Sequence, residues 1–326
     1  MKRLLKFAMT AMAAVLSAGT AIAEEFPSRP ITVIVSAPAG GTTDVLARLL
    51  AVPMGRALGQ AMIIENVGGA GGRIGTGKAA HAKPDGYTLN LGNSGFLAAS
   101  VALYPKLDWD SRKDFAPVGL VATLPMTLAV GVSTPYHDLK SLMDAMASKP
   151  GMTTIATPGP GSTSDLAAAI FLSRASLKAN VINYKGGGPA LNDVMAGHVD
   201  MIFDQTSGIL PMHKAGRVRA LAVSAERRLP QSPDVPTFRE AGLADYNVRI
   251  WNALVAPTGT PRPVLEKLEK ALSLALDDPE FKAALDKVAG EAPTPDERGP
   301  ARLRQLLVAD VDRFTKLVRE TGMKVE

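Results

Sequence analysis

The chain has 326 residues, no cysteine and a formal net charge of +5, with 46% hydrophobic and 21% charged residues. The lack of cysteine excludes disulfides, thiolate nucleophiles and thiolate metal sites. The charge is too small for the concentrated basic face that nucleic-acid binding requires, so we expect no nucleic-acid partner. A chain of this length predicts two lobes with a large enough core to fold without disulfides.

Residues 1–23 have the pattern of a secretory signal peptide. A basic start is followed by a short apolar stretch and by Ala21-Ile22-Ala23, an A-x-A cleavage site. Cleavage after Ala23 removes the three basic residues Lys2, Arg3 and Lys6 and lowers the formal net charge from +5 to +2. No later stretch is long and apolar enough to span a membrane, so we expect an exported mature chain that does not insert into one.

The first unit after the signal peptide is a strand, a glycine turn and a helix. Residues 31–35 are all β-branched, as in a strand buried on both faces, and residues 45–58 carry apolar side chains at helical spacing. We expect Thr42, Thr43 or Asp44 to cap this helix, and Pro53 to kink or divide it. The turn, Ala39 to Asp44, would present free N–H groups at a helix N-terminus to a carboxylate or phosphate. The alternative is a turn that binds nothing.

The same alternation continues along the chain and predicts an α/β fold. Further strands are expected at residues 62–67, 87–91, 153–157, 181–184, 200–203 and 218–223. Further helices are expected at 74–82, 139–147, 162–177, 190–196, 264–276, 280–288 and 300–319. Two long apolar segments, 114–131 and 248–255, interrupt this pattern and predict strands that cross between lobes.

Because the chain crosses between the lobes twice, the strands and helices of one lobe are inserted within the sequence of the other. Lobe 1 would comprise residues 24–123 and 248–326, and lobe 2 residues 124–247. Two α/β lobes joined by two crossing hinge strands make a hinged clamp. The cleft would lie where the loops after the strands of both lobes face each other.

In lobe 2, Gly161-Ser162-Thr163-Ser164 forms a second loop in which glycine and hydroxyl side chains precede a helix, as in Ala39 to Asp44. These two glycine-hydroxyl loops would face each other across the cleft. Two helix N-termini can hold an anion without an arginine. Other candidates end strands or begin loops at the cleft: Asn93, Ser94, Thr157, Tyr184 and Asp204. Asp204 would accept a hydrogen bond from a ligand hydroxyl, amide or ammonium, or else lie in a solvated turn.

No catalytic or metal constellation stands out in the sequence. The four histidines, His81, His137, His198 and His213, are scattered without metal-ligand spacing, and Ser162 is not in a G-x-S-x-G elbow. Residues 72–79 match part of a P-loop, but Ala79 stands where a magnesium-binding Ser or Thr is needed. We therefore expect no metal, no cofactor and no enzymatic activity.

Many short motifs resemble one family in order and spacing, among them Ala39-Gly40-Gly41-Thr42-Thr43-Asp44 and Pro84-Asp85-Gly86-Tyr87-Thr88-Leu89. The others lie at residues 29–32, 47–48, 65–66, 69–72, 114–118, 184–186, 189–190, 219–223, 234–237, 240–242, 251, 256–257 and 259–261. The chain resembles the Bug family, the periplasmic substrate-binding proteins of tripartite tricarboxylate transporters (TctC-like proteins), over essentially its whole mature length.

The resemblance implies the α/β fold of a two-lobed, type II, Venus-flytrap periplasmic binding protein with two crossing hinge strands. It also implies a monomeric periplasmic protein that captures a small organic carboxylate by hinge closure and delivers it to membrane transporter subunits. It also implies that the two glycine-hydroxyl loops hold the carboxylate, partly through ordered water. The ligand stays open among dicarboxylates, tricarboxylates, acidic amino acids and aromatic acids. A secreted α/β hydrolase and a sensor-type binding protein that signals to a membrane receptor are the alternative functions.

Overall fold

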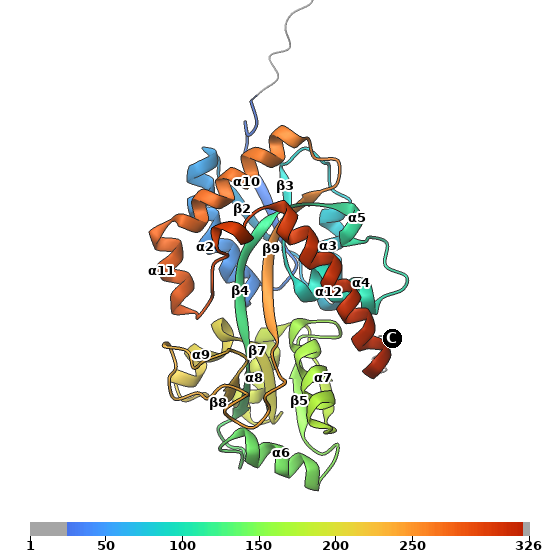
Figure 1. Cartoon of the computed structure of the whole chain (residues 1–326), viewed down its shortest axis with the longest axis vertical. Helices are drawn as coiled ribbons and strands as arrows, with labels where there is room; N and C mark the ends of the chain where they lie inside the picture. The colour runs from blue at the N-terminus through green and yellow to red at the C-terminus, as the bar shows by residue number, and fades with distance from the viewer. Residues whose placement is uncertain (1–24, 322–326) are drawn as a thin grey trace, which may run out of the picture.

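The computed structural model describes residues 25–321 (Figure 1). The proposed signal peptide therefore lies outside the described residues. Within the described range, no helix is both long and apolar enough to cross a membrane.

One mixed sheet runs through the molecule in the order β2-β1-β3-β9-β4-β7-β5-β6, with β8 also paired to β4. The strands are β1 (Ile31–Val35), β2 (Met62–Asn66), β3 (Thr88–Asn93), β4 (Phe115–Gly131), β5 (Thr154–Thr157), β6 (Asn180–Asn183), β7 (Met201–Gln205), β8 (Val218–Val223) and β9 (Arg249–Pro257). In lobe 1, β1 is parallel to both β2 and β3, and in lobe 2, β5 is parallel to both β6 and β7. The predicted α/β class is thus confirmed.

Two long strands join the lobes. The first half of β4 pairs antiparallel with β9, from Phe115 opposite Pro257 to Pro125 opposite Arg249. The second half of β4 pairs with β7 and β8 in lobe 2. Figure 1 shows both strands running from one lobe into the other. The two crossing strands are confirmed, whereas the lobe limits at 123/124 and 247/248 stay predictions.

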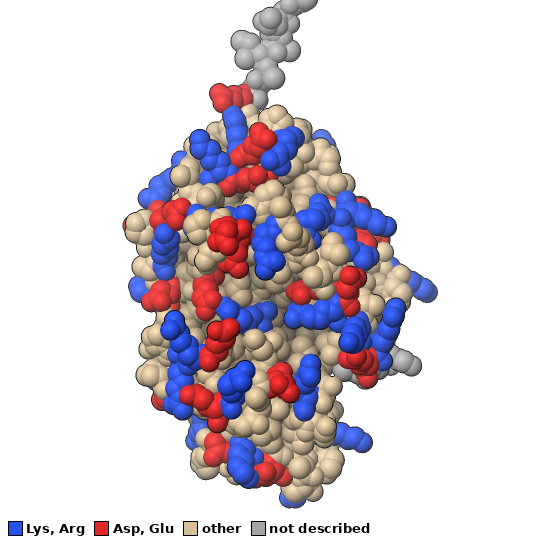
Figure 2. Space-filling view, in the orientation of Figure 1, with Lys and Arg blue, Asp and Glu red and all other residues tan. Residues whose placement is uncertain are grey.

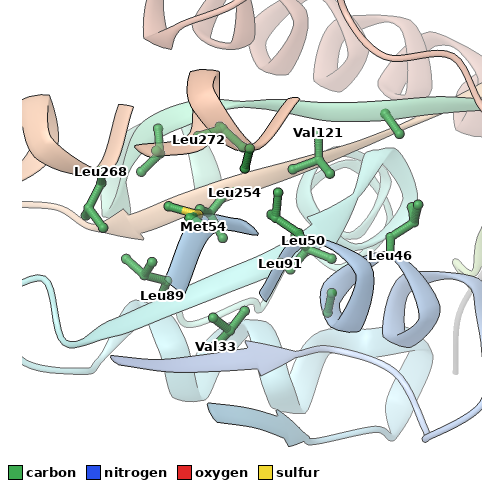
Figure 3. Close-up of a cluster of buried hydrophobic side chains, with 14 of the residues drawn as sticks. Val33, Leu46, Leu50, Met54, Leu89, Leu91, Val121, Leu254, Leu268 and Leu272 are labelled. Carbon is green, nitrogen blue, oxygen red and sulfur yellow. The ribbon is translucent and has the colours of Figure 1, made fainter. Parts of the chain in front are cut away.

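Lobe 1 is built around a core between its sheet and three helices, α2 (Thr42–Leu58), α10 (Arg262–Asp277) and α11 (Pro279–Lys287). Figure 3 shows Leu46, Leu50 and Met54 of α2 pointing into this core. The expectation that Pro53 would divide α2 is wrong, because the helix is continuous with a buried Pro53 inside it. Packing of this buried face outweighs the lost hydrogen bond.

Lobe 2 packs four helices against its part of the sheet: α6 (Leu139–Ser148), α7 (Thr163–Ala175), α8 (Gly187–Ala196) and α9 (Thr206–Lys214). An aromatic cluster of Phe171, Phe203, Phe238 and Tyr246 fills one side of the core, with neighbouring rings 4.1 to 6.5 Å apart. The Tyr246 hydroxyl donates to the Ala167 carbonyl at 3.0 Å, which satisfies its buried polar atom.

The remaining helices complete lobe 1: α3 (Arg73–Ala80), α4 (Ser100–Leu103), α5 (Ser111–Asp114) and α12 (Pro300–Thr321), with η1 (Ala70–Gly72), η2 (Gly95–Ala99) and η3 (Pro295–Glu297). The Trp251 indole on β9 donates to the Asp310 carboxylate on α12 at 2.7 Å, so a crossing strand is tied to the last helix. Acidic and basic side chains are interspersed on the face drawn in Figure 2.

Candidate functional site

A cavity of about 500 Å³ lies between the two lobes. Its lining comes from both of them, and consists of Ser36 to Ala39, Gly41 to Thr43, Gly69 to Gly72, Asn93, Phe96, Pro158 to Pro160, Ser162 to Ser164, Asn183 to Gly188, Asp204 and Gln205. Its volume suits a small organic molecule.

Four helices begin at this cavity: α2 after Gly41, α7 after Ser162, α8 after Gly186 and α9 after Gln205. Each helix start presents free N–H groups and the positive end of a dipole. Among the lining residues only Lys185 has a cationic side chain, and it is exposed. The arrangement attracts an anion through backbone groups.

The first loop differs in detail from the sequence prediction. The helix cap is Gly41, and none of Thr42, Thr43 or Asp44 takes that place. Asp44 instead lies in the first turn, where its carboxylate accepts from the Gly40 N–H at 2.8 Å. Burial opposes ionisation of Asp44, but hydrogen bonds from Arg48, Gly40 and Asn66 together lower its pKa. The carboxylate thereby fixes the shape of the glycine turn.

The second loop repeats this arrangement. Ser162 caps α7, and its hydroxyl accepts from the Asp165 N–H at 3.2 Å. The Asp165 carboxylate accepts from the Gly161 N–H at 2.9 Å, as Asp44 does from Gly40. Burial raises the pKa of Asp165. Sequence reasoning missed Asp165, although Gly-x-Thr-Thr/Ser-Asp recurs in both loops and is a visible signal.

The lobes meet around the cavity. Thr42 of α2 and Ser207 of α9 share a hydrogen bond through their hydroxyl groups. The Tyr104 hydroxyl of lobe 1 donates to the Pro160 carbonyl of lobe 2 at 3.1 Å. A Cβ on Gly71 would lie 2.3 Å from that carbonyl oxygen, so only glycine permits this approach. The structure therefore shows a closed cleft.

The structure brings most of the predicted site residues to the cavity, and the others are not part of its lining. Ala39, Gly41, Thr42, Thr43, Asn93, Ser162, Thr163, Ser164, Tyr184 and Asp204 line it, whereas Gly40, Asp44, Ser94, Thr157 and Gly161 do not. Gly40 and Gly161 are held by the two carboxylates just described. Thr157 donates to Asn183, and Ser94 is fully buried. Ligand contact by any of these residues stays a prediction.

Several lining residues were not predicted, above all Gly186 to Gly188. The helix expected from Ala190 begins at Gly187, so its N-terminus reaches the cavity. Pro189 then lies in the first turn of α8, where a backbone N–H has no partner within the helix and its loss costs nothing. A proline in this position is typical of a helix start, so Pro189 could have indicated that the helix begins at Gly187. Phe96 and Asn183 also line the cavity, and only the tertiary fold brings them there, whereas Gln205 was expected beside Asp204 at the end of a strand at the cleft.

Among the residues that the structure describes, Asp204 is the only one with an acidic side chain in the cavity lining. Its carboxylate accepts from the Gln205 N–H at 2.8 Å. Burial raises the pKa of Asp204 to about 6, and this hydrogen bond offsets the rise only in part. Across residues 25–321, no group of three or more His, Cys, Asp or Glu residues is arranged to hold a metal ion.

Comparison with known families gives one match that spans most of the chain. Residues 46–323 match the family model described as "Tripartite tricarboxylate transporter family receptor" (TctC). The chain belongs to the TctC family. A curated TctC-type relative is 38% identical over 302 residues, which are 92% of this chain and 86% of that protein; it is the "UPF0065 protein in the TAR-I ttuE-ttuC' intergenic region" of Agrobacterium vitis.

Solved structures of related proteins have the same fold as this chain. The periplasmic binding protein BugD is 34% identical with a TM-score of 0.88, over 92% of this chain and 100% of that one. MatC from Rhodopseudomonas palustris, solved with bound malate, is 38% identical with a TM-score of 0.86, over 90% of this chain and 100% of that one. The fold is therefore that of the periplasmic binding proteins, and the family is one of solute-binding proteins.

Proposed function

We propose that this protein is a periplasmic solute-binding protein that captures a small organic carboxylate between its lobes and delivers it to a tripartite membrane transporter. The observation that carries the proposal is the convergence of four helix N-termini on one cavity between the lobes. Backbone N–H groups at helix starts bind carboxylates without a cationic side chain. The malate bound to the related MatC supports the same ligand class.

Capture would proceed by closure of the two lobes. The ligand carboxylate first meets the N–H groups of one loop in the open form, and the second lobe then closes onto it. The contacts of Thr42 with Ser207 and of Tyr104 with Pro160 join the lobes, so they exist only in the closed form. A ligand that contacts both helix starts favours that form. The transporter would recognise the closed form.

The lining of the cavity favours binding over catalysis. It contains no histidine, and the Ser162 hydroxyl accepts the hydrogen bond of a helix cap. A serine nucleophile needs a neighbouring base in hydrogen-bond contact. We therefore prefer solute binding to the secreted hydrolase that the sequence left open.

A thermal-shift screen of the mature chain tests the proposal, because a ligand that binds only the native state raises the Tm. Small organic acids should raise the Tm, and neutral sugars should not. Stabilisation by sugars alone would contradict the proposal.

A variant of the first loop links the effect to the cavity. A Cβ at Gly41 would lie 3.6 Å from the Pro38 carbonyl oxygen, which is an ordinary contact, and Gly41 has a φ of −79°. The backbone therefore accepts Gly41→Leu, and the leucine side chain adds volume at the cavity wall. Its Tm should match that of the wild type without ligand, and the shift with acids should vanish. Ala147→Leu on the exposed face of α6 is the matched control and should keep the full shift.

A further inference from the structure

Asp204 presents one oxygen to the cavity without a protein partner. Its Oδ1 accepts from the Gln205 N–H at 2.8 Å, and no described residue donates to Oδ2. Two glycines surround Oδ2: a Cβ on Gly208 would lie 2.7 Å from it, and a Cβ on Gly187 3.8 Å from it. The backbone of α8 and α9 thus leaves room for this oxygen and supplies no hydrogen bond to it.

Within residues 25–321, no side chain donates a hydrogen bond to this carboxylate or neutralises its charge. Thr127 lies opposite Asp204 in the antiparallel ladder, yet its buried hydroxyl makes no hydrogen bond. Burial raises the pKa of Asp204 to about 6, and no neighbouring cation counters that effect. The carboxylate is still mostly ionised at neutral pH, because its pKa lies below 7. Asp204 is partly buried and lines the cavity, so water or a ligand donor can reach Oδ2, and an apolar ligand group that displaces such water leaves the oxygen unpaired.

The position of Asp204 in the fold brings its Oδ2 close to the proposed carboxylate site. Ser207, one residue before Gly208, meets Thr42 at the start of α2. Asp204 and the first glycine-hydroxyl loop therefore lie at the same end of the cavity. A ligand carboxylate held there would carry its neighbouring carbon atoms past Asp204.

We propose that Asp204 makes the cavity selective for acids that carry a hydroxyl or ammonium donor, against acids of the same length without one. This inference rests on the proposed function. The four helix starts attract the carboxylate, and Asp204 Oδ2 accepts from the donor. An unsubstituted diacid of the same length carries the same two carboxylates but leaves Oδ2 unpaired, and this penalty opposes its binding.

Calorimetric titration with three acids of equal chain length tests the proposal: succinate without a donor, malate with a hydroxyl and aspartate with an ammonium. Adipate and 2-aminoadipate form a longer pair. In the wild type, at least one donor-bearing acid should bind 10-fold or more tightly than its unsubstituted partner. Equal affinities within a pair, or tighter binding of the unsubstituted acid, would overturn the selectivity while leaving the proposed function intact.

The variant Asp204→Asn sharpens the test. Because Oδ1 stays paired with the Gln205 N–H, the amide nitrogen would replace Oδ2 and turn the acceptor into a donor. Donor-bearing acids should then lose 10-fold or more in affinity, and succinate or adipate should bind more tightly than to the wild type. Asp144→Asn on the exposed face of α6 is the matched control. An unchanged ratio in Asp204→Asn would overturn the inference; if no acid binds the wild type, the proposed function itself fails.

Discussion

Thr42 and Ser207 hydrogen-bond across the cleft, one from the first turn of α2 and the other from the first turn of α9. Both helices begin at the same cavity. The hydrogen bond between these two side chains therefore joins α2 to α9 close to their N-termini. The contact links closure of the lobes to the geometry of the proposed anion site.

Removing this contact should weaken ligand binding through closure. Ser207→Ala deletes one hydroxyl at a partly exposed position, which costs about 1 kcal/mol, or about a fivefold rise in Kd. The Tm without ligand should change little, because the lost contact joins the lobes and belongs to neither core. Isothermal titration with the acid that gives the largest thermal shift measures the change, and an unaltered Kd would contradict this role.

Tyr104 should control the rate of ligand release. Its hydroxyl donates to Pro160 across the cleft at 3.1 Å, and the Arg73 guanidinium stacks on its ring at 3.7 Å. Tyr104→Phe keeps the ring and the stacking but loses the hydrogen bond. We expect the dissociation rate to rise about 2- to 10-fold, with a smaller change in the association rate. Stopped-flow measurement decides this, and an effect confined to association would contradict it.

The matched carboxylates of the two loops should respond oppositely to the same substitution. Hydrogen bonds lower the pKa of Asp44, with Arg48 among the donors, so its ionised form stabilises the fold at neutral pH. Asp44→Asn should therefore cost about 1–2 kcal/mol at pH 7. Burial raises the pKa of Asp165, so Asp165→Asn removes an unfavourable buried charge and should leave the Tm equal or higher. Denaturant unfolding compares the two, and equal losses would contradict the contrast.

Asp204 should make the ligand-free protein less stable as the pH rises. Its pKa in the folded protein is raised to about 6, above the usual value of 3.8. Between these values the folded state binds more protons than the unfolded state, so this group's contribution to stability falls as the pH increases. The Tm of Asp204→Asn minus that of the wild type should therefore grow from pH 4 to pH 7. A constant or shrinking difference would show that the pKa of Asp204 is not raised.

The parts of the fold that could be predicted from the sequence are those that short segments of the chain determine by themselves. The crossing strands β4 and β9 were visible as apolar runs because they are buried on both faces. The two glycine-hydroxyl loops were visible because tight turns and helix starts need particular residues. Pro53 misled the prediction, because packing in the core of lobe 1 decides whether a helix continues through a proline.

The parts of the site that escaped prediction depend on contacts between distant segments. Thr42 and Ser207 are 165 positions apart, and nothing near either residue indicates the other. The start of α8 was placed too late because Gly186 to Pro189 resembles a loop, although its glycines approach Pro38 and Asp204. Asp165 is the exception, since the repeated Gly-x-Thr-Thr/Ser-Asp pattern could have revealed it.

The most direct test of carboxylate capture is a crystal structure of the mature chain with the acid that gives the largest thermal shift. We predict that the acid lies in the cavity between the lobes. Its carboxylate should contact the N–H groups at the starts of α2 and α7, directly or through one water. A ligand bound outside the cavity, or one whose carboxylate faces away from both helix starts, would contradict the account.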